Sequence, residues 1–328
     1  MIPISVLDTV PVSEGSTPRD AMQASAALAR LSEELGFARF WIAEHHAMDG
    51  IGGAATAVVL AHIGHATQTI RIGSGGIMLP NHNPFVIAEQ FGTLDALFPG
   101  RIDLGVGRAP GADGRIANAM RKNIGQAAEY FPQDVMDLRI YFDGQAEDAL
   151  KPNPGWGASG IEMWMLGSSL YGAQLAAQLG MPYAFASHFA PDHLDTALAL
   201  YRERFQPSER WDKPHVMAGM TVFTAETDRE AQILASSQEQ MYVALRTGQP
   251  GKILPPVPDY RESLPMQAQA MLAHVGQAAA VGSPATVRAA VGRFLDRTQV
   301  DELIISGATF DPAARRHGIK LTWDALSA

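Results

Sequence analysis

The chain has 328 residues, of which 47% are hydrophobic and 18% charged, so it is long enough to bury one large core. Its 25 basic and 34 acidic residues give a formal net charge of -9, which argues against a nucleic-acid partner or a polybasic membrane patch and favours a small-molecule partner. No cysteine is present, which excludes disulfides, thiolate metal sites and cysteine nucleophiles.

The beginning of the chain and one uncharged segment bear on the cellular compartment. MIPISVLDTV lacks a basic region and reaches Asp8 early, so we expect neither a signal peptide nor a membrane anchor, and the cytoplasm is the expected location. Residues 50–70 carry no Asp, Glu, Lys or Arg, but their glycines, histidines and threonines make them too polar to span a membrane. We therefore expect a helix there that is buried on two faces.

Short β-rich runs alternate with helical patterns along the whole chain, and no long polar linker divides it. The predicted strands are residues 2–8, 38–44, 69–76, 101–107, 162–167, 182–187, 215–225 and 301–306. Helical patterns follow these runs, and repeated strand–helix order implies a parallel sheet. Eight such units in one undivided chain predict a single domain, residues 1–328, with a (β/α)8 TIM barrel; an open doubly wound sheet is the alternative.

The connection between the seventh and eighth predicted strands, residues 226–300, is too long for one crossover. Within it, residues 246–265 contain five prolines and little periodicity, so regular structure is not expected there. We interpret residues 246–275 either as a mobile lid over the active site or as a passive insertion.

Polar residues follow the second predicted strand in WIAEHHAMDG, residues 41–50, at the end of the barrel where active sites lie. Adjacent residues on an extended strand point to opposite faces, so His45 and His46 are not expected to bind one metal ion. The chain contains no His-x-His or Glu-x-x-His spacing either, so we predict no metal site. Glu44 and the two histidines are then either catalytic or simply structural.

Three other turns at strand ends could bind a ligand. In GVGRAPGADG, residues 105–114, the spacing does not fit the dinucleotide fingerprint, but the glycines would let a phosphate or anionic ring approach Arg108. Ser168 and Ser169 precede a helix, where they could bind an anion or cap the helix. Gly75-Gly76 could allow a planar ligand to lie against the backbone, or form a plain tight turn.

Taken together, GFARFWIAEHH, IRIGSGGIMLPNHNPFVIAEQFGTLDALFPGRIDLGVGRAPG and LGSSLYGAQLAAQLGMPYAF resemble the bacterial-luciferase-like flavin monooxygenases, in particular the single-chain, non-luminescent members. The resemblance covers nearly the whole chain. It implies a (β/α)8 barrel that binds reduced FMN from a separate NAD(P)H:flavin reductase. With O2, such an enzyme oxygenates an organic substrate through a flavin hydroperoxide.

The resemblance also implies roles for individual residues. His45 matches the family's catalytic histidine beside the flavin ring, and Glu44 either orients it or belongs to the barrel interior. Gly75-Gly76 matches a cis peptide bond that packs against the isoalloxazine ring. Arg108 and Ser169 match residues that contact the FMN phosphate.

Two positions depart from the luminescent relatives. Gly172 stands where luciferase has a hydroxyl residue that touches the phosphate, so that contact is either missing or made by Ser168 or Tyr171. Gly107 stands where the luminescent α chain has a reactive cysteine, so we do not expect light emission.

A homodimer is expected from the uncharged helix, which needs an apolar partner on its outer face. The helix predicted at residues 84–97 would add Phe85, Ile87, Phe91 and Leu94 to this surface, and the family resemblance points to the same surface.

Other functions stay open at this point. The same barrel could carry hydride transfer with the deazaflavin F420, a metal-dependent hydrolase, or a flavin-binding subunit without turnover. The substrate is expected to be small and apolar from methionines and aromatics such as Met78, Met163, Met165 and Phe185, although these residue types are common in any core.

Overall fold

The computed structural model describes residues 2–328 except 110–115, 117–118, 121–123 and 146–149. Nine parallel strands form one sheet in this part of the chain. Eight of them close into a barrel: β1 (Ile4–Asp8), β2 (Arg39–Ile42), β3 (Arg71–Met78), β4 (Ile102–Gly107), β5 (Glu162–Gly167), β6 (Tyr183–Phe185), β7 (Val216–Thr224) and β9 (Glu302–Ser306). β1 pairs with both β2 and β9, and β7 pairs with both β6 and β9, which completes the ring. The predicted (β/α)8 barrel is therefore confirmed.

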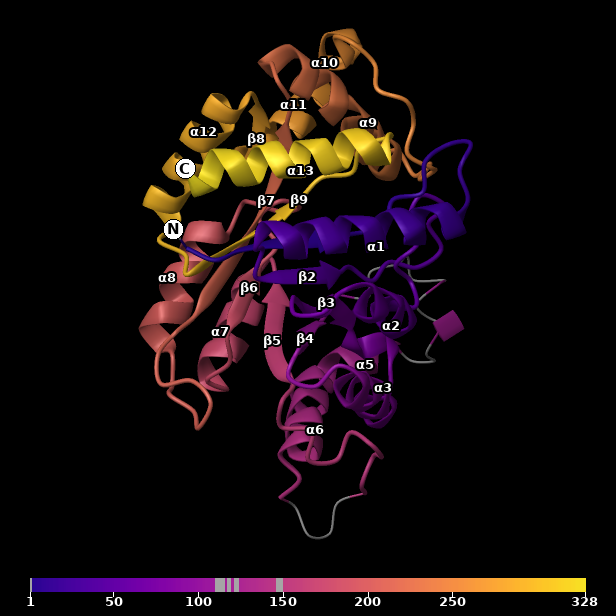
Figure 1. Cartoon of the computed structure of the whole chain (residues 1–328). Helices are drawn as coiled ribbons and strands as arrows, with labels where there is room; N and C mark the ends of the chain where they lie inside the picture. Colours follow the sequence, from indigo (N-terminus) through magenta and orange to yellow (C-terminus); the bar gives the residue numbers. More distant parts are fainter. Residues whose placement is uncertain (1, 110–115, 117–118, 121–123, 146–149) are drawn as a thin grey trace.

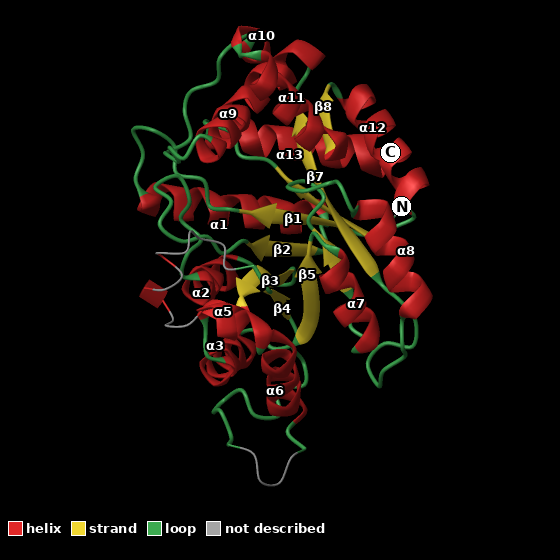
Figure 2. Ribbon diagram, turned by 180° about the vertical axis from the view of Figure 1, so that it is seen from behind, coloured by secondary structure: helices red, strands yellow, loops and turns green. Residues whose placement is uncertain are grey.

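Helices surround the barrel (Figures 1 and 2). They are α1 (Pro18–Leu35), α2 (Thr56–Ala66), α3 (Pro84–Leu97), α5 (Ile124–Glu129), α6 (Phe131–Asp143), α7 (Leu170–Gln178), α8 (Leu194–Arg204), α9 (Asp228–Arg246), α10 (Tyr260–Ser263), α11 (Met266–Val275), α12 (Pro284–Thr298) and α13 (Pro312–Ser327), with 3-10 turns η1 (Leu79–Asn81) and η2 (Gly276–Ala278). None of the helices in the described residues is both long and apolar enough to cross a bilayer.

Local sequence explains where the best-defined helices begin and end. Thr17 accepts a hydrogen bond from the Asp20 amide, the Asp20 side chain accepts one from the Thr17 amide, and Pro18 supplies the first helical position of α1. Gly36 then ends the helix in the left-handed conformation that glycine adopts without steric cost. Thr227 and Glu230 form the same reciprocal cap at the start of α9.

The barrel strands are buried on both faces. Alternate residues pack outward against the helices, and the others fill the barrel interior as a separate cluster: Leu7, Trp41, Ala43, Trp164, Ala184, Met217 and Ile304. The rings of Trp41 and Trp164 meet edge to face, with centroids 5.4 Å apart. The barrel is therefore a packed core, and a ligand can be bound only at its ends.

A charged network fills the end of the barrel formed by the amino termini of the strands. The Arg39 guanidinium lies 2.8 Å from Asp103, 2.9 Å from Glu162 and 3.1 Å from Glu302. Asp103 and Glu302 are almost fully buried. Burial opposes ionisation of Glu302, but the nearby His215, whose Nε2 lies 3.8 Å away, the charge of Arg39 and a hydrogen bond from Ser5 lower its pKa. This end of the barrel is therefore closed by a structural network of ion pairs around Arg39.

The long connection between β7 and β9 contains more regular structure than the sequence predicted. It includes β8 (Ala279–Gly282), which among the described strands pairs only with the carboxyl-terminal part of β7, residues 221–224. β8 is therefore an edge strand and not one of the eight barrel strands. Residues 260–263 and 266–275 are helical as α10 and α11, so the expected irregular structure is confined to residues 247–259 and 264–265. Alanine-rich β8 lacks the β-branched and aromatic residues that identify strands from sequence.

The surface made by α2 and α3 also differs from the prediction. Ile87, Phe91 and Leu94 are buried in the chain's own core and do not face outward. Val58, in contrast, is 72% exposed, so α2 is not covered on both faces within one chain. The sequence pattern correctly marked α2 and α3 as apolar, but it did not tell the inner face of each helix from the outer one.

Candidate active site

The carboxyl ends of the strands bring together the residues that the sequence singled out, and they separate His45 from His46. His45 follows β2, and its Nδ1 atom is buried without a hydrogen-bond partner in the described part of the chain. Burial lowers the pKa of His45, and the nearby Glu44 carboxylate only partly offsets this. His45 is therefore a neutral imidazole near pH 7, with one nitrogen that the protein does not use.

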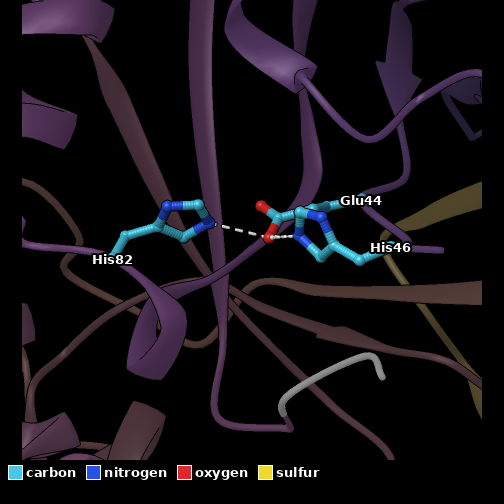
Figure 3. Close-up of side chains that lie close together, drawn as sticks. All are labelled: Glu44, His46 and His82. Carbon is cyan, nitrogen blue, oxygen red and sulfur yellow. Dashed lines mark hydrogen bonds and ion pairs between the residues drawn. The ribbon is translucent and has the colours of Figure 1, made fainter. Parts of the chain in front are cut away.

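His46 turns to the side, where it belongs to a cluster with Glu44 and His82 (Figure 3). The Nε2 atoms of His46 and His82 lie 2.6 Å and 2.7 Å from the same oxygen, Oε1 of Glu44. The other oxygen of Glu44 accepts the Met78 amide at 3.2 Å. Burial opposes the charged form, but the bonds from His46 and His82 outweigh it and lower the pKa of Glu44. Glu44 is thus a buried anion that orients two histidines.

This cluster was missed by the sequence analysis, which looked for other spacings. Two histidines and a carboxylate are donors that zinc and iron accept, and the three atoms lie within 4.8 Å of one another. In this structure they use one another as hydrogen-bond partners. The available signals were the alternate spacing of Glu44 and His46, and the position of His82 at the end of the short turn η1 that follows β3.

A second buried histidine, His188, follows β6 and was also missed. In the ring of strands β6 stands opposite β2, and His45 disfavours a positive charge on His188. Burial, and then repulsion from His45, lower the pKa of His188 to about 4. Its ring lies against β7, where a Cβ atom added to Gly219 would be 2.1 Å from Nδ1 of His188. Two neutral imidazoles therefore occupy the same end of the barrel.

Arg108 and the start of α7 form a group with unused hydrogen-bonding capacity. The Arg108 guanidinium stacks on the ring of Tyr171, 4.1 Å from its centroid, which holds it beside the first turn of α7. Arg108 has no ion-pair partner within the described ranges, and its side chain is exposed. Ser169 occupies the N-cap position of α7, but its side chain makes no capping bond. A cation, a hydroxyl and the free amides of a helix N-terminus are thus close together.

The other predicted residues have the following surroundings. Ser168 is partly buried and precedes the N-cap. The Gly75-Gly76 peptide bond is cis, as the resemblance implies. A Cβ atom on Gly75 would meet Leu7 at 2.5 Å, and one on Gly76 would meet the backbone oxygen of Gly105 at 2.7 Å. The two glycines are therefore required by packing inside the barrel, a reason that the sequence analysis did not consider.

One cavity between described residues lies away from this site. It has a volume of about 190 Å³ and is lined by the first residues of β5 together with Arg139, Arg210 and Trp211. It therefore opens at the amino-terminal end of the barrel strands, next to the ion-pair network around Arg39. The chemistry of the side chains, and not the size of a cavity, identifies the opposite end as the candidate active site.

Comparison with known proteins agrees with this assignment. Residues 3–302 match the family model for luciferase-like monooxygenases. A protein of Escherichia coli (strain K12) called luciferase-like monooxygenase is 46% identical over 324 residues, which cover 98% of this chain and 96% of that protein. The crystal structure of apo-MsnO8 has a TM-score of 0.89 at 31% identity, covering 100% of this chain and 99% of that one.

More distant structures share only the fold. A Type II Baeyer-Villiger monooxygenase from Pseudomonas putida in complex with FMN has a TM-score of 0.68 at 19% identity and covers 98% of this chain and 96% of that one. An F420-dependent secondary alcohol dehydrogenase has a TM-score of 0.64 at 16% identity, with 99% of each chain covered. The match to the family model over most of its length, together with the 46% identical relative, shows that this chain belongs to the luciferase-like monooxygenase family of oxidoreductases.

Proposed function

We propose that this protein is a flavin-dependent monooxygenase that uses reduced FMN and O2 to oxygenate a small, mainly apolar organic substrate. The observation that carries the proposal is the unused anion-binding group formed by Arg108, Ser169 and the N-terminus of α7. Membership of the luciferase-like monooxygenase family supports it, as does the FMN bound in the Baeyer-Villiger structure on the same fold.

The group at the start of α7 suits a terminal phosphate. A dianion there would accept charge-assisted hydrogen bonds from Arg108 and hydrogen bonds from the Ser169 hydroxyl and the first amides of α7. Gly172, in the first turn of α7, has no side chain to compete for this space, and Ser168 is the neighbouring hydroxyl that can add a further contact. FMN would be held by Arg108, Ser168 and Ser169, with Tyr171 fixing the Arg108 guanidinium by stacking.

When bound, reduced FMN supplies the two electrons with which O2 is split between the product and water. His45 provides the proton chemistry that such a reaction needs. Its neutral ring can take up a proton at Nδ1, which has no partner among the described side chains, and can return the proton later. Glu44 is a positioning residue in this scheme, because its carboxylate bonds to His46 and His82 and not to His45.

Exclusion of water is the other requirement, since stray water and protons divert reduced oxygen to hydrogen peroxide. The segment of residues 246–275 is the part of the chain that we assign to this task, as a lid that closes over bound flavin and substrate. We further propose that a separate NAD(P)H:flavin reductase supplies the reduced FMN.

Anaerobic titration of the purified protein with reduced FMN and with reduced F420 tests the cofactor, and single-turnover mixing with isotopically labelled O2 tests the reaction. The expected result is tight binding of reduced FMN and, with a suitable substrate, one labelled oxygen atom in the product. Binding of F420 in preference to FMN, or release of all the oxygen as peroxide across a broad substrate panel, would contradict the proposal.

A further inference from the structure

The mouth of the barrel contains one buried histidine that the proposed function does not use. His188 has no ion-pair partner and no side-chain hydrogen bond within the described part of the chain. Its position is nevertheless well defined. The backbone oxygen of His188 accepts a hydrogen bond from the hydroxyl of Tyr242, on α9, at 3.3 Å. Tyr242 in turn contacts Gln238, whose Oε1 accepts the amide of Ala308 after β9 at 2.7 Å. His188 is therefore held between β6, α9 and β9.

The packing of the ring determines which nitrogen carries its proton. Nδ1 is buried against the backbone of Gly219, where no acceptor lies within reach in the described structure. A proton on Nδ1 would leave a buried N–H group without a partner, which costs more than leaving an acceptor free. The proton consequently belongs on Nε2, the nitrogen that is not buried against β7.

The charge of the ring follows from its surroundings. No carboxylate among the described residues pairs with His188, and burial and the proximity of His45 keep its pKa near 4, so the ring is neutral at physiological pH. A neutral imidazole with its proton on Nε2 is a hydrogen-bond donor without a net charge. It favours an uncharged acceptor such as a carbonyl oxygen, whereas an anion gains more from a cation such as Arg108.

We propose that His188 binds the substrate by donating a hydrogen bond from Nε2–H to an acceptor oxygen, and that the substrates are uncharged organic molecules that carry a carbonyl group. This rests on the proposed function, because it names the substrate class of the same site. It adds a specificity-determining residue across the barrel from His45, with separate tasks: His45 manages protons and His188 orients the substrate.

The test uses the full-length protein without flavin, so that it does not depend on oxygenation. Isotope-labelled histidines are observed by NMR, with His188→Leu assigning the His188 signals. The probes are matched pairs that differ in the carbonyl group, acetophenone with ethylbenzene and cyclohexanone with cyclohexane. The expected result is a neutral ring protonated on Nε2, whose Nε2 signal shifts with the ketones and not with the hydrocarbons.

Binding constants for the same probes provide the second measurement. Losing one neutral hydrogen bond should weaken ketone binding by about two- to tenfold in His188→Leu and leave hydrocarbon binding unchanged. Gly219→Ala should have the same effect, because its Cβ would displace the ring without removing it. His193→Leu is the matched control, since His193 is exposed in the same loop and should change nothing.

Two results would overturn the inference: a His188 ring that is charged or protonated on Nδ1 at neutral pH, or ketones that bind wild-type protein no better than the hydrocarbons. If His188→Leu fails to fold, the wild-type tautomer and the Gly219→Ala binding ratio still decide the question. An enzyme that passes these tests but does not oxygenate with FMN would contradict only the proposed function. One that oxygenates but shows no ketone preference would contradict only the role of His188.

Discussion

His45 and His46 are neighbours in the chain, yet their surroundings have almost nothing in common. His46 is bonded to the buried carboxylate of Glu44, while Nδ1 of His45 is buried without a partner and its ring is near His188. The alternation of side chains at a strand end accounts for this separation. Of these two adjacent histidines, His46 therefore makes a structural hydrogen bond, and His45 has a nitrogen available to accept a proton.

His45→Ala should fold and bind reduced FMN but lose substrate oxidation by about 10²–10⁴-fold, and release peroxide instead, because a positioned acid–base group contributes roughly that factor. The measurement is turnover coupled to a reductase, scored for product and hydrogen peroxide. His46→Ala is the control: it should lower stability by about 1–3 kcal/mol through the partner lost by Glu44, with little change in product per turnover. An unchanged rate and yield in His45→Ala would show that the wrong histidine was chosen.

Arg108→Ala should weaken FMN binding by about 1.5–3 kcal/mol, or roughly ten- to hundredfold, while riboflavin, which lacks the phosphate, should bind almost as before. Ser169→Ala should act in the same direction with a smaller effect. Equilibrium titration with both flavins provides the comparison, and Arg229→Ala, an exposed arginine already paired with Asp259, serves as the matched control. Equal losses for FMN and riboflavin would rule out the phosphate role.

At the scale of elements, the segment of residues 246–275 has a buried anchor at Ile253 and further contacts with α9, such as the Val257 amide that Ser236 Oγ accepts at 2.7 Å. Ile253 is fully buried; its amide bonds to the Val12 oxygen at 3.0 Å, and its oxygen accepts the Glu14 amide at 2.8 Å. Residues 254–259 have no regular structure, and Met266 at the start of α11 is 85% exposed. We therefore expect motion in the exposed, irregular stretch next to this anchor.

Limited proteolysis of the free protein should therefore cut first within residues 246–275, and FMN together with a substrate should protect this stretch. Ile253→Ala should speed the cut several-fold, because truncating a buried isoleucine weakens the anchor by about 2–5 kcal/mol. Ile319→Ala, at a partly buried site on α13, is a control for a general loss of stability. Early cleavage elsewhere, or no protection by ligands, would leave the lid without support.

At the scale of the whole molecule, apolar side chains remain exposed on the neighbouring helices α2 and α3. Val58 is 72%, Val86 45% and Leu97 51% exposed. We predict that this surface forms a homodimer, with about twice the chain mass of 35.2 kDa in light scattering. Val58→Asp combined with Val86→Asp should shift the protein to the monomer, whereas Val257→Asp, on the exposed part of the 246–275 segment, should not. A wild-type mass of one chain at micromolar concentration would contradict the dimer.

Acid should destabilise the protein in two pH ranges. His188 is protonated near its ordinary pKa of 6.5 in the unfolded chain, but only near 4 in the folded chain. Its contribution to the free energy of unfolding is therefore complete above pH 6.5 and is lost as the pH falls towards 4. Glu302, whose folded pKa is lowered from 4.5, adds stability that is present above 4.5 and is lost at lower pH. Urea midpoints measured across these ranges should decline in both. His188→Leu should reduce the decline in the upper range, to which the lowered pKa of His45 also contributes, and leave the lower range unchanged. An unchanged profile would contradict the buried neutral ring.

The sequence by itself determined the order and type of the barrel elements, because strand and helix periodicities are local properties. It also located Glu44, His45, Arg108 and Ser169 at one end of the barrel, since the carboxyl ends of parallel strands lie together. Identification of the wider family required combined motifs, because each turn alone had an ordinary structural explanation.

Only the tertiary structure decided which side chains meet. Glu44 and His82 are 38 residues apart, and His188, whose pKa His45 lowers, follows the strand opposite β2, so neither pairing has a local signal. The inner faces of α2 and α3 and the edge strand β8 were undecided for the same reason. Periodicity tells which side chains of one segment share a face, but not which other segment that face meets. Closure of the barrel determines which segments stand opposite each other, and therefore which imidazoles are buried, neutral and available for chemistry.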